Sequence, residues 1–256
     1  MIRLSVNVNK VATLRNARGG HVPSVNEAVD VCLSAGAPGI TVHPRADERH
    51  ITRDDVVSVA RQLGTSTRLL EPHASYDGGF EFNIEGDPRA EFVDLVVAAR
   101  PHQCTLVPVM PGEVTSQAGW SASTSPERLT AVIARLQAEG IRVSVFVDPE
   151  EAAVRWAKRL GADRIELYTE PFARAFEQSR DAGRASFAAY AAAATLAHSL
   201  GLGINAGHDL DLDNLVLFRE LPHLDEVSIG HALIAHALYV GLDRSVRDYL
   251  DVIGGR

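Results

Sequence analysis

Residues 142–169 read RVSVFVDPEEAAVRWAKRLGADRIELYT, and this stretch contains a strand, a helix and a second strand in succession. Its first segment alternates valine with Ser144, Phe146 and Asp148, which is the two-residue period of a β-strand. The helical segment that follows ends at Gly161, where a left-handed cap is expected. The first strand therefore has one apolar face and one face that carries polar groups.

The same unit recurs along the whole chain, with capping chemistry such as Ser24 three residues before Glu27. The predicted strands are 2–9, 39–43, 80–85, 103–108, 142–148, 164–169, 203–206 and 226–229. The predicted helices are 24–36, 52–63, 89–99, 126–139, 150–161, 186–201, 211–219 and 237–252. Eight β/α units in about 250 residues match a (β/α)8 barrel.

The competing fold is a doubly wound open sheet, which also alternates strand and helix. Helices cover both faces of such a sheet, so both faces of its strands are apolar. Here most strands are apolar on one face alone, as in FEFNIE, where Glu81, Asn83 and Glu85 occupy the other. We therefore expect an α/β fold, a single (β/α)8 TIM-barrel domain over residues 1–256, whose polar strand faces point inward.

Composition restricts the possible partners. The 256 residues carry a formal net charge of −8, which argues against general binding to nucleic acid or to an anionic membrane. We expect neither a signal peptide nor a membrane-spanning helix, and two cysteines without metal spacing suit a reducing cytosol. Residues 7–20, NVNKVATLRNARGG, are nevertheless purely basic, and we expect a loop after the first strand to carry Lys10 and Arg18 to the rim of the barrel. This segment is a nucleic-acid patch, a solvated surface or a pocket for a small anion.

Three long connections interrupt the alternation. Residues 110–124 and 170–185 follow predicted strands at the face where barrels carry their chemistry, and both are long enough to be lids. Residues 65–79 enter the opposite face, so we expect this segment to affect assembly or stability more than catalysis.

Chemically active side chains gather at the predicted C-terminal strand ends, where barrel enzymes have their active sites. They are Asn7, Asn9, Lys10, His43, Arg45, Glu85, Asp148, Glu170, Asn205, Gly207, His208, Gly230 and His231. A single histidine at a strand end is more often a hydrogen-bonded structural residue than a catalyst. Three histidines opposite a carboxylate favour a functional site.

Within this set, Glu85, His43 and His208 indicate acid–base chemistry. A partly enclosed glutamate tends to have a raised pKa and can act as a general base or acid. Together with two histidines it can move several protons, which favours a multistep condensation over a single hydrolysis. Asp148 and Glu166 also point inward, and we interpret them as supporting or core polar groups.

Other residues of the set indicate an anion site. The guanidinium of Arg45 suits phosphate or carboxylate, and His50 adds a donor, although a solvated loop paired with Asp47 is the alternative. Gly207 and Gly230 each precede a histidine after the last two strands, where barrels often bind phosphate through backbone N–H groups. Two tight strand-to-helix turns are the alternative there.

Six ordered segments resemble the pyridoxine 5′-phosphate synthase family: NVNKVATLRNARGG, GITVHPRADERHI, FNIEG, LVPVMPGEVTS, LGINAGHDL and EVSIGHALI. The resemblance implies a (β/α)8 barrel with extra helices that acts in the cytoplasm as a homo-octamer, a tetramer of dimers. It implies a condensation of 1-deoxy-D-xylulose 5-phosphate with 3-amino-2-oxopropyl phosphate. The products would be pyridoxine 5′-phosphate, phosphate and water, and neither cofactor nor metal would take part.

The resemblance also implies roles for individual residues. His43 would be a general base, Glu85 a second base and His208 a proton donor. Asn7 and Arg18 would hold the aminoketone phosphate, whereas Arg45, His50 and Thr115 would hold the deoxyxylulose phosphate. Further substrate contacts would come from Asn9, Lys10, Asp209, Gly230 and His231.

The chain departs from many family members at three places. Asn9-Lys10 replaces an Asp-His pair, although a branch of the family shares it and lysine can bind phosphate as a point charge. Asp209 replaces a glycine, which alters a backbone contact, and 65–79 is longer than expected. The basic start then favours the small-anion pocket over nucleic acid.

Two other functions stay open. One is a metal-dependent sugar isomerase, in which Glu85, Glu166, His208 and Asp209 would gather a divalent ion. The other is a phosphate-binding protein without turnover, against which the intact set of His43, Glu85 and His208 argues.

Overall fold

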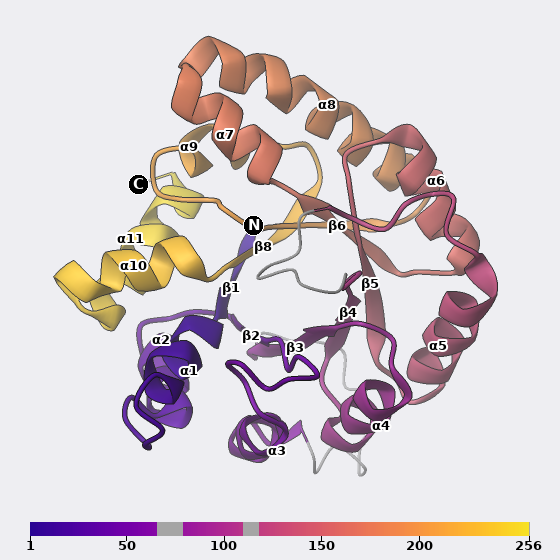
Figure 1. Cartoon of the computed structure of the whole chain (residues 1–256). Helices are drawn as coiled ribbons and strands as arrows, with labels where there is room; N and C mark the ends of the chain where they lie inside the picture. Colours follow the sequence, from indigo (N-terminus) through magenta and orange to yellow (C-terminus); the bar gives the residue numbers. More distant parts are fainter. Residues whose placement is uncertain (66–78, 110–117, 256) are drawn as a thin grey trace.

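The computed structural model describes residues 1–65, 79–109 and 118–255, and its centre is a closed barrel of eight parallel strands (Figure 1). Each strand pairs with the next along the chain, and β8 pairs with β1. The strands are β1 (Arg3–Asn7), β2 (Gly39–Val42), β3 (Glu81–Gly86), β4 (Gln103–Leu106), β5 (Arg142–Val147), β6 (Arg164–Tyr168), β7 (Gly203–Gly207) and β8 (Leu224–Ile229). The predicted (β/α)8 architecture is confirmed.

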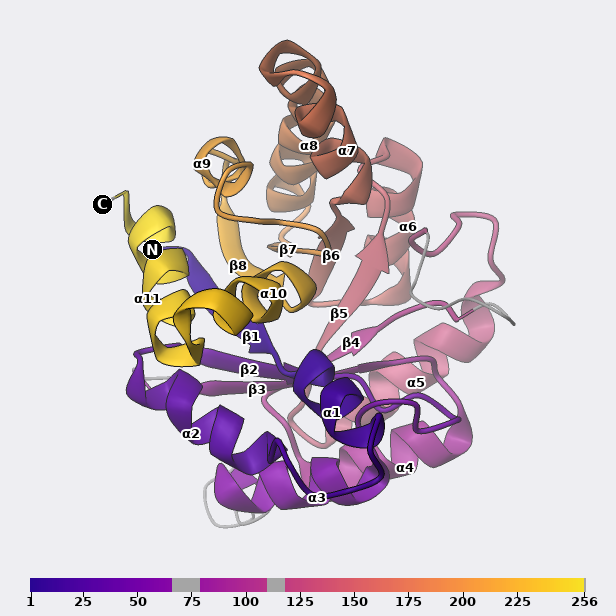
Figure 2. The same cartoon turned by 60° about the vertical axis from the view of Figure 1, so that its left-hand side comes forward.

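Helices surround the barrel on its outside, as the two views in Figures 1 and 2 show. They are α1 (Asn9–Asn16), α2 (Val25–Ser34), α3 (Arg53–Gln62), α4 (Ala90–Ala99), α5 (Pro126–Ala138), α6 (Glu151–Leu160), α7 (Glu170–Gln178), α8 (Arg180–Ser199), α9 (Leu215–Phe218), α10 (His231–Val240) and α11 (Leu242–Gly254). Gly161, which was predicted to end a helix, does so with a positive φ of 84°.

The two faces of the strands separate as the alternation predicts. Outward residues such as Leu4 and Val6 are fully buried against the helices, whereas inward residues are buried and polar. Inside the barrel, the hydroxyls of Ser5 and Thr41 lie 2.7 Å apart, and Asn83 Nδ2 donates to Thr41 Oγ1 at 3.3 Å. Thr105 Oγ1 lies 3.2 Å from Asn83 Oδ1, so hydrogen bonds link successive strands across the interior.

A charged network fills the N-terminal end of the barrel. Arg142 pairs with Glu81, and its Nε donates to Gln103 Oε1 at 3.0 Å. Arg164 Nη1 donates to Asn205 Oδ1 at 2.8 Å. These side chains fill the interior of the barrel at its N-terminal end. The interior is therefore open to a ligand from the C-terminal ends of the strands.

The basic segment after the first strand is a helix, α1, and not the loop that we expected. Its first turn begins where Asn7 Oδ1 accepts the backbone N–H of Asn9 at 3.0 Å, and Val11 lies buried beneath it. Arg15 Nη2 donates to Asp55 Oδ2 at 2.8 Å, which ties α1 to α3. Tertiary contacts therefore stabilise a helix that is too short to be stable alone.

Residues 170–185 form α7 and the start of α8, so the expectation of a lid loop there is wrong. The helix is held by an aromatic cluster in which the rings of Phe172 and Phe218 lie 4.9 Å apart. The single helix predicted over 237–252 is two helices, because the chain turns at Gly241 with a φ of 86°. The other lid candidate, 110–124, and the connection 65–79 lie largely outside the described residues.

Candidate active site

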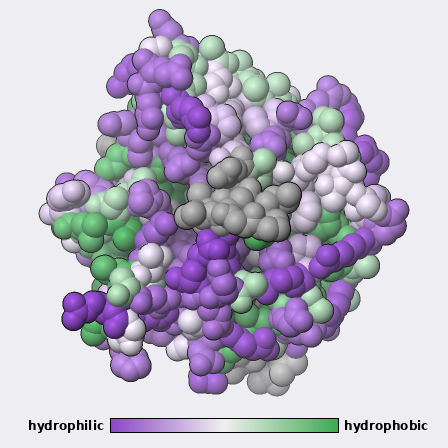
Figure 3. All heavy atoms as spheres, viewed as in Figure 1, coloured by the Kyte–Doolittle hydropathy of each residue, from purple (hydrophilic) through white to green (hydrophobic). Residues whose placement is uncertain are grey.

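A cavity of about 360 Å³ opens among the C-terminal ends of the strands. All eight strands, or the residues directly after them, contribute to its wall. Figure 3 shows hydrophilic side chains around the centre of this face. The lining residues are Asn7, Asn9, Lys10, His43, Arg45, His50, Glu85, Val107, Phe146, Glu166, His208, Asp209, Ser228, Gly230 and His231.

The structure brings together eleven of the thirteen residues predicted for the site. Arg18 lies beyond the end of α1, where its side chain is exposed and is not among the lining residues. The helix carries the chain away from the mouth by about 1.5 Å per residue. Thr115 lies outside the described residues. The lining residues that sequence reasoning did not assign to the site are Val107, Phe146, Glu166 and Ser228.

The motif Asn7-Val-Asn9 connects three elements of the site. Asn9 Oδ1 accepts the backbone N–H of His43 at 2.9 Å, which fixes the segment after β2 against the start of α1. Asn7 Nδ2 donates to Glu85 Oε2 at 3.4 Å. A Cβ on Gly230 would lie 3.0 Å from Asn7 Cβ, so a glycine suits this close approach.

His43 and Glu85 form a buried neutral pair. Burial lowers the pKa of His43 well below its usual value, and the charge of Arg45 lowers it further. Burial raises the pKa of Glu85 to about 8. Although Nδ1 of His43 lies 3.7 Å from Oε2 of Glu85, the contact is therefore not an ion pair at neutral pH. Nε2 of His43 is buried without a hydrogen-bond partner in the described part of the chain, so it can accept a proton from a ligand.

Glu166 is a second buried carboxyl group in the cavity wall. Burial and the neighbouring Glu85 raise its pKa well above the usual value, while Thr105 Oγ1 lies 3.3 Å from its Oε2. A Cβ on Gly207 would lie 2.3 Å from Glu166 Oε1, so the glycine makes room for this carboxyl. The alternation of β6 predicted that Glu166 points inward. It could not show whether the carboxyl lies in the barrel core or in the wall of the cavity.

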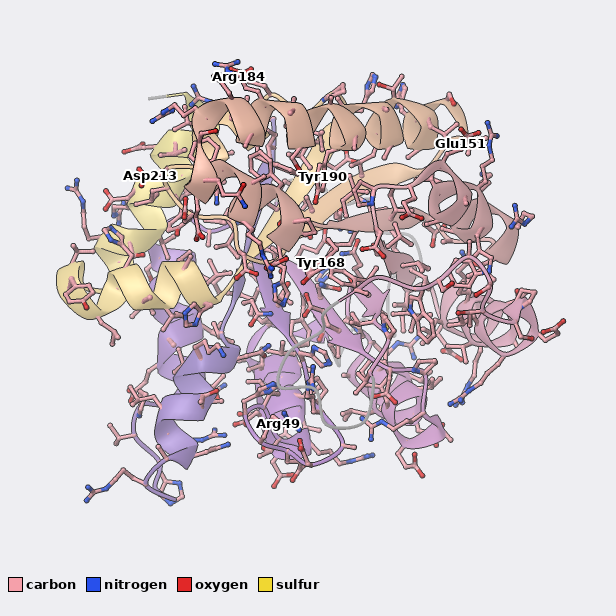
Figure 4. The ribbon with its side chains drawn as sticks, turned by 45° about the horizontal axis from the view of Figure 1, so that its top comes forward. Arg49, Glu151, Tyr168, Arg184, Tyr190 and Asp213 are labelled. Atoms are coloured by element: carbon pink, nitrogen blue, oxygen red, sulfur yellow. The ribbon has the colours of Figure 1, made fainter. Side chains whose placement is uncertain are left out.

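His208 and Asp209 follow β7 with φ angles of 85° and 54°. His208 Nδ1 lies 2.9 Å from Asp209 Oδ2, and the rings of His208 and Tyr168 form a T-shaped pair with 5.4 Å between centroids. Figure 4 shows Tyr168 near the centre of the barrel, with Tyr190 of α8 above it in this view. Tyr190 donates its hydroxyl to the carbonyl of Tyr168 at 2.8 Å, which anchors this wall of the cavity to α8.

Cationic and N–H groups occupy the other part of the wall. Lys10 and Arg45 line it together with His231, which begins α10. The first turn of α10 contains no acidic side chain, so its backbone N–H groups favour an anion. Burial and the charge of Arg45 lower the pKa of His50 to about 4, and its Nδ1 accepts the N–H of Ile51 at 2.9 Å. His50 is therefore neutral and offers an Nε2–H donor.

The residues of the possible metal site do not converge. Within residues 1–65, 79–109 and 118–255, no three His, Cys, Asp or Glu side chains form a group that could hold a metal ion. None of the helices described is both long enough and apolar enough to span a membrane.

The fold and the cavity define a (β/α)8 barrel protein whose cavity wall combines cationic side chains and helix N–H groups with buried titratable groups. The family model "Pyridoxal phosphate biosynthesis protein PdxJ" matches residues 4–255, and the chain belongs to this family.

Named relatives agree with this assignment. The chain is 51% identical over 252 residues to a pyridoxine 5′-phosphate synthase of Porphyromonas gingivalis, covering 98% of each chain. It is 48% identical over 255 residues to the enzyme of that name from Leptospira biflexa, covering 99% of this chain and 97% of the relative. A tryptophan synthase structure from M. tuberculosis shares the fold, with a TM-score of 0.59 at 12% identity and coverage of 99% and 92%.

Proposed function

We propose that the chain is a pyridoxine 5′-phosphate synthase of vitamin B6 biosynthesis. It joins 1-deoxy-D-xylulose 5-phosphate to 3-amino-2-oxopropyl phosphate and releases phosphate and water. The relatives that carry this name match the chain over nearly its whole length. The observation that supports the chemistry best is the buried neutral pair of His43 and Glu85 beside a cavity wall with cationic groups.

The proposed proton transfers use three residues. Closing a ring from an aminoketone and a sugar phosphate forms bonds to nitrogen and carbon while oxygen leaves as water and phosphate. Protons therefore have to be removed at some atoms and supplied at others. We assign removal to His43, whose neutral Nε2 is unpartnered among the described residues, and to Glu85. We assign donation to His208 on the opposite wall.

The remaining residues hold the substrates. Arg45 and His50 are proposed to bind the phosphate of the sugar, and Gly230 and His231 contact phosphate at the N-terminus of α10. Asn7 is assigned to the aminoketone phosphate. Arg18 and Thr115 stay predictions, since the first lies away from the cavity and the second outside the described residues.

A direct assay tests the reaction and its alternatives. Purified protein with both substrates is expected to form pyridoxine 5′-phosphate and phosphate at equal rates, with or without EDTA. Activity that EDTA abolishes and a divalent ion restores would favour the metal-dependent isomerase. Substrate binding without product at high enzyme concentration would favour the non-catalytic binding protein.

Lys10 gives a test of substrate binding. Lys10→Ala is expected to raise the Michaelis constant for the sugar phosphate about 10- to 100-fold with a smaller effect on kcat, because it removes a charge from the cavity wall. Steady-state kinetics with each substrate varied in turn measures this. Lys158→Ala on the exposed side of α6 is the matched control. An unchanged Michaelis constant would show that Lys10 does not contact substrate.

We also propose that the chain forms a cytoplasmic homo-octamer, a tetramer of dimers. Exposed apolar side chains on α10 support assembly, since Leu238 is 71% and Tyr239 89% exposed, and Figure 3 shows apolar residues at the position of α10 in Figure 1. The two buried free cysteines suit a reducing compartment. Light scattering that gives the mass of a monomer at micromolar concentration would exclude the octamer.

A further inference from the structure

We propose that Asp209 is a positioning residue for His208, fixing the imidazole tautomer and stabilising the protonated ring that donates to the substrate. The inference rests on the proposed function, because it requires His208 to be the proton donor. In this proposal the side chain of Asp209 binds the His208 ring, and only the backbone of Asp209 contacts the substrate.

The contact itself decides the tautomer. His208 Nδ1 lies 2.9 Å from Asp209 Oδ2. The hydrogen bond from His208 lowers the pKa of Asp209, so this group is a carboxylate at neutral pH. A carboxylate only accepts hydrogen bonds, and Nδ1 therefore carries a hydrogen whether the ring is neutral or charged. The proton that is gained and lost during turnover is then the one on Nε2.

The backbone holds the carboxylate in place. Asp209 has a left-handed φ of 54°, a conformation that aspartate tolerates better than most residues with a side chain. Asn214 Nδ2 donates to the carbonyl of Asp209 at 3.1 Å, and Thr169 Oγ1 donates to the carbonyl of Gly207 at 2.9 Å. Side chains from two other segments thus fix the turn on both sides of His208.

The surrounding charges keep Asp209 ionised. Arg174 on α7 and His231 on α10 both favour its carboxylate form. The other acidic group in this part of the cavity wall, Glu166, keeps its proton because it is buried. Glu170 on α7 pairs with Arg174, and Tyr168 has a raised pKa of about 12, so it is neutral. Asp209 is therefore ionised where it contacts the ring.

A glycine at this position would accept the same φ but would offer no carboxylate. Two substitutions separate the backbone effect from the electrostatic effect. Asp209→Gly relieves any strain of the left-handed conformation, whereas Asp209→Asn keeps the shape and tolerates that conformation. Both remove the charge. If the carboxylate acts on His208, both variants lower kcat by a similar factor and leave the Michaelis constants nearly unchanged.

The experiment is steady-state kinetics of pyridoxine 5′-phosphate formation at pH 8 with each substrate varied in turn. Without the carboxylate, the His208 ring is no longer held with its hydrogen on Nδ1 and its Nε2 toward the substrate, whereas the groups that bind the phosphates are unchanged. Both variants are therefore expected to reduce kcat about 3- to 10-fold and to leave both Michaelis constants within about twofold. Asp213→Asn, an exposed aspartate in the same connection and distant from Tyr168 in Figure 4, is expected to leave kcat unchanged.

The same measurements separate the possible failures. Wild-type enzyme that forms no pyridoxine 5′-phosphate would count against the proposed function. Wild-type turnover together with an unchanged kcat in both variants would overturn the role of Asp209 alone. As a further check, Asp209→Asn is expected to have no additional effect in a His208→Gln background, since the carboxylate acts through that ring. An additive loss would also contradict the proposal.

Discussion

Glu85→Gln is expected to reduce kcat about 10³-fold while both Michaelis constants stay within about threefold. Glutamine has the shape of glutamate, and its amide oxygen can still accept one of the two hydrogen bonds that Asn7 and Ser228 donate to separate carboxyl oxygens. It cannot take up a proton, however, so the loss should appear in the chemical steps rather than in binding. Steady-state kinetics with each substrate varied in turn measures both constants.

The pH profile should identify the group that was removed. Burial raises the pKa of Glu85 to about 8, so the base form becomes populated only as pH rises through that value. Wild-type activity is expected to increase across this range, and the residual activity of Glu85→Gln should lack that ascending limb. An ascending limb that persists unchanged in the variant would assign it to another group.

The same substitution should stabilise the fold in alkaline solution. Between about pH 4.5 and 8 the folded protein keeps a proton on Glu85 that the unfolded chain has lost. Since the folded state binds more protons, stability falls as pH rises through this window. Glutamine removes this dependence, and the free energy of unfolding at pH 8 should increase by up to about 4 kcal/mol. Denaturant titrations at several pH values measure the change.

Glu220→Gln, an exposed carboxylate on the outside of the barrel, is the matched control and should alter neither activity nor stability by much. A variant of Glu85 that loses activity together with stability would indicate a structural role. A fall in kcat of less than about tenfold would contradict the assignment of Glu85 as a base.

The strand pattern shows how much of the fold the sequence could predict. Apolar and polar residues alternate along a strand whenever one of its faces meets the helices and the other meets the lumen, so the pattern is visible in the sequence. Every predicted strand is present, with small shifts at its ends. Helix α1 was missed because most of its residues are polar and its stability comes from contacts such as Arg15 with Asp55, far apart in sequence. Helix α7 was missed for the same reason, since Phe172 finds its partner Phe218 only in the folded chain.

The candidate site was predictable where a residue ends a strand, because parallel strand ends meet at one edge of the barrel. This accounts for His43 and Glu85, and for His208. Glu166 lies deeper, and only the space left by Gly207 places its carboxyl in the cavity wall. Arg18 was expected at the rim because a loop was assumed where α1 leads the chain outward.

His43→Gln is expected to lower kcat about 10³-fold as well, with little change in either Michaelis constant. The neutral Nε2 of His43 can accept a proton, and a glutamine amide cannot replace it in this role. The hydrogen bond from the backbone N–H of His43 to Asn9 Oδ1 does not depend on the His43 side chain and should persist. His21→Gln, an exposed histidine before α2, is the control and should retain full activity. A His43 variant that keeps more than about a tenth of the wild-type kcat would show that another group removes the proton.

Two further measurements distinguish a lost base from a damaged site. In His43→Ala, added imidazole should restore part of the activity, because the substitution leaves space for the missing ring in the cavity wall. The double variant with Glu85→Gln should be about as slow as the slower single variant, since residues 3.7 Å apart that serve one proton path do not contribute independently. Multiplied losses would instead mean that His43 and Glu85 act in separate steps.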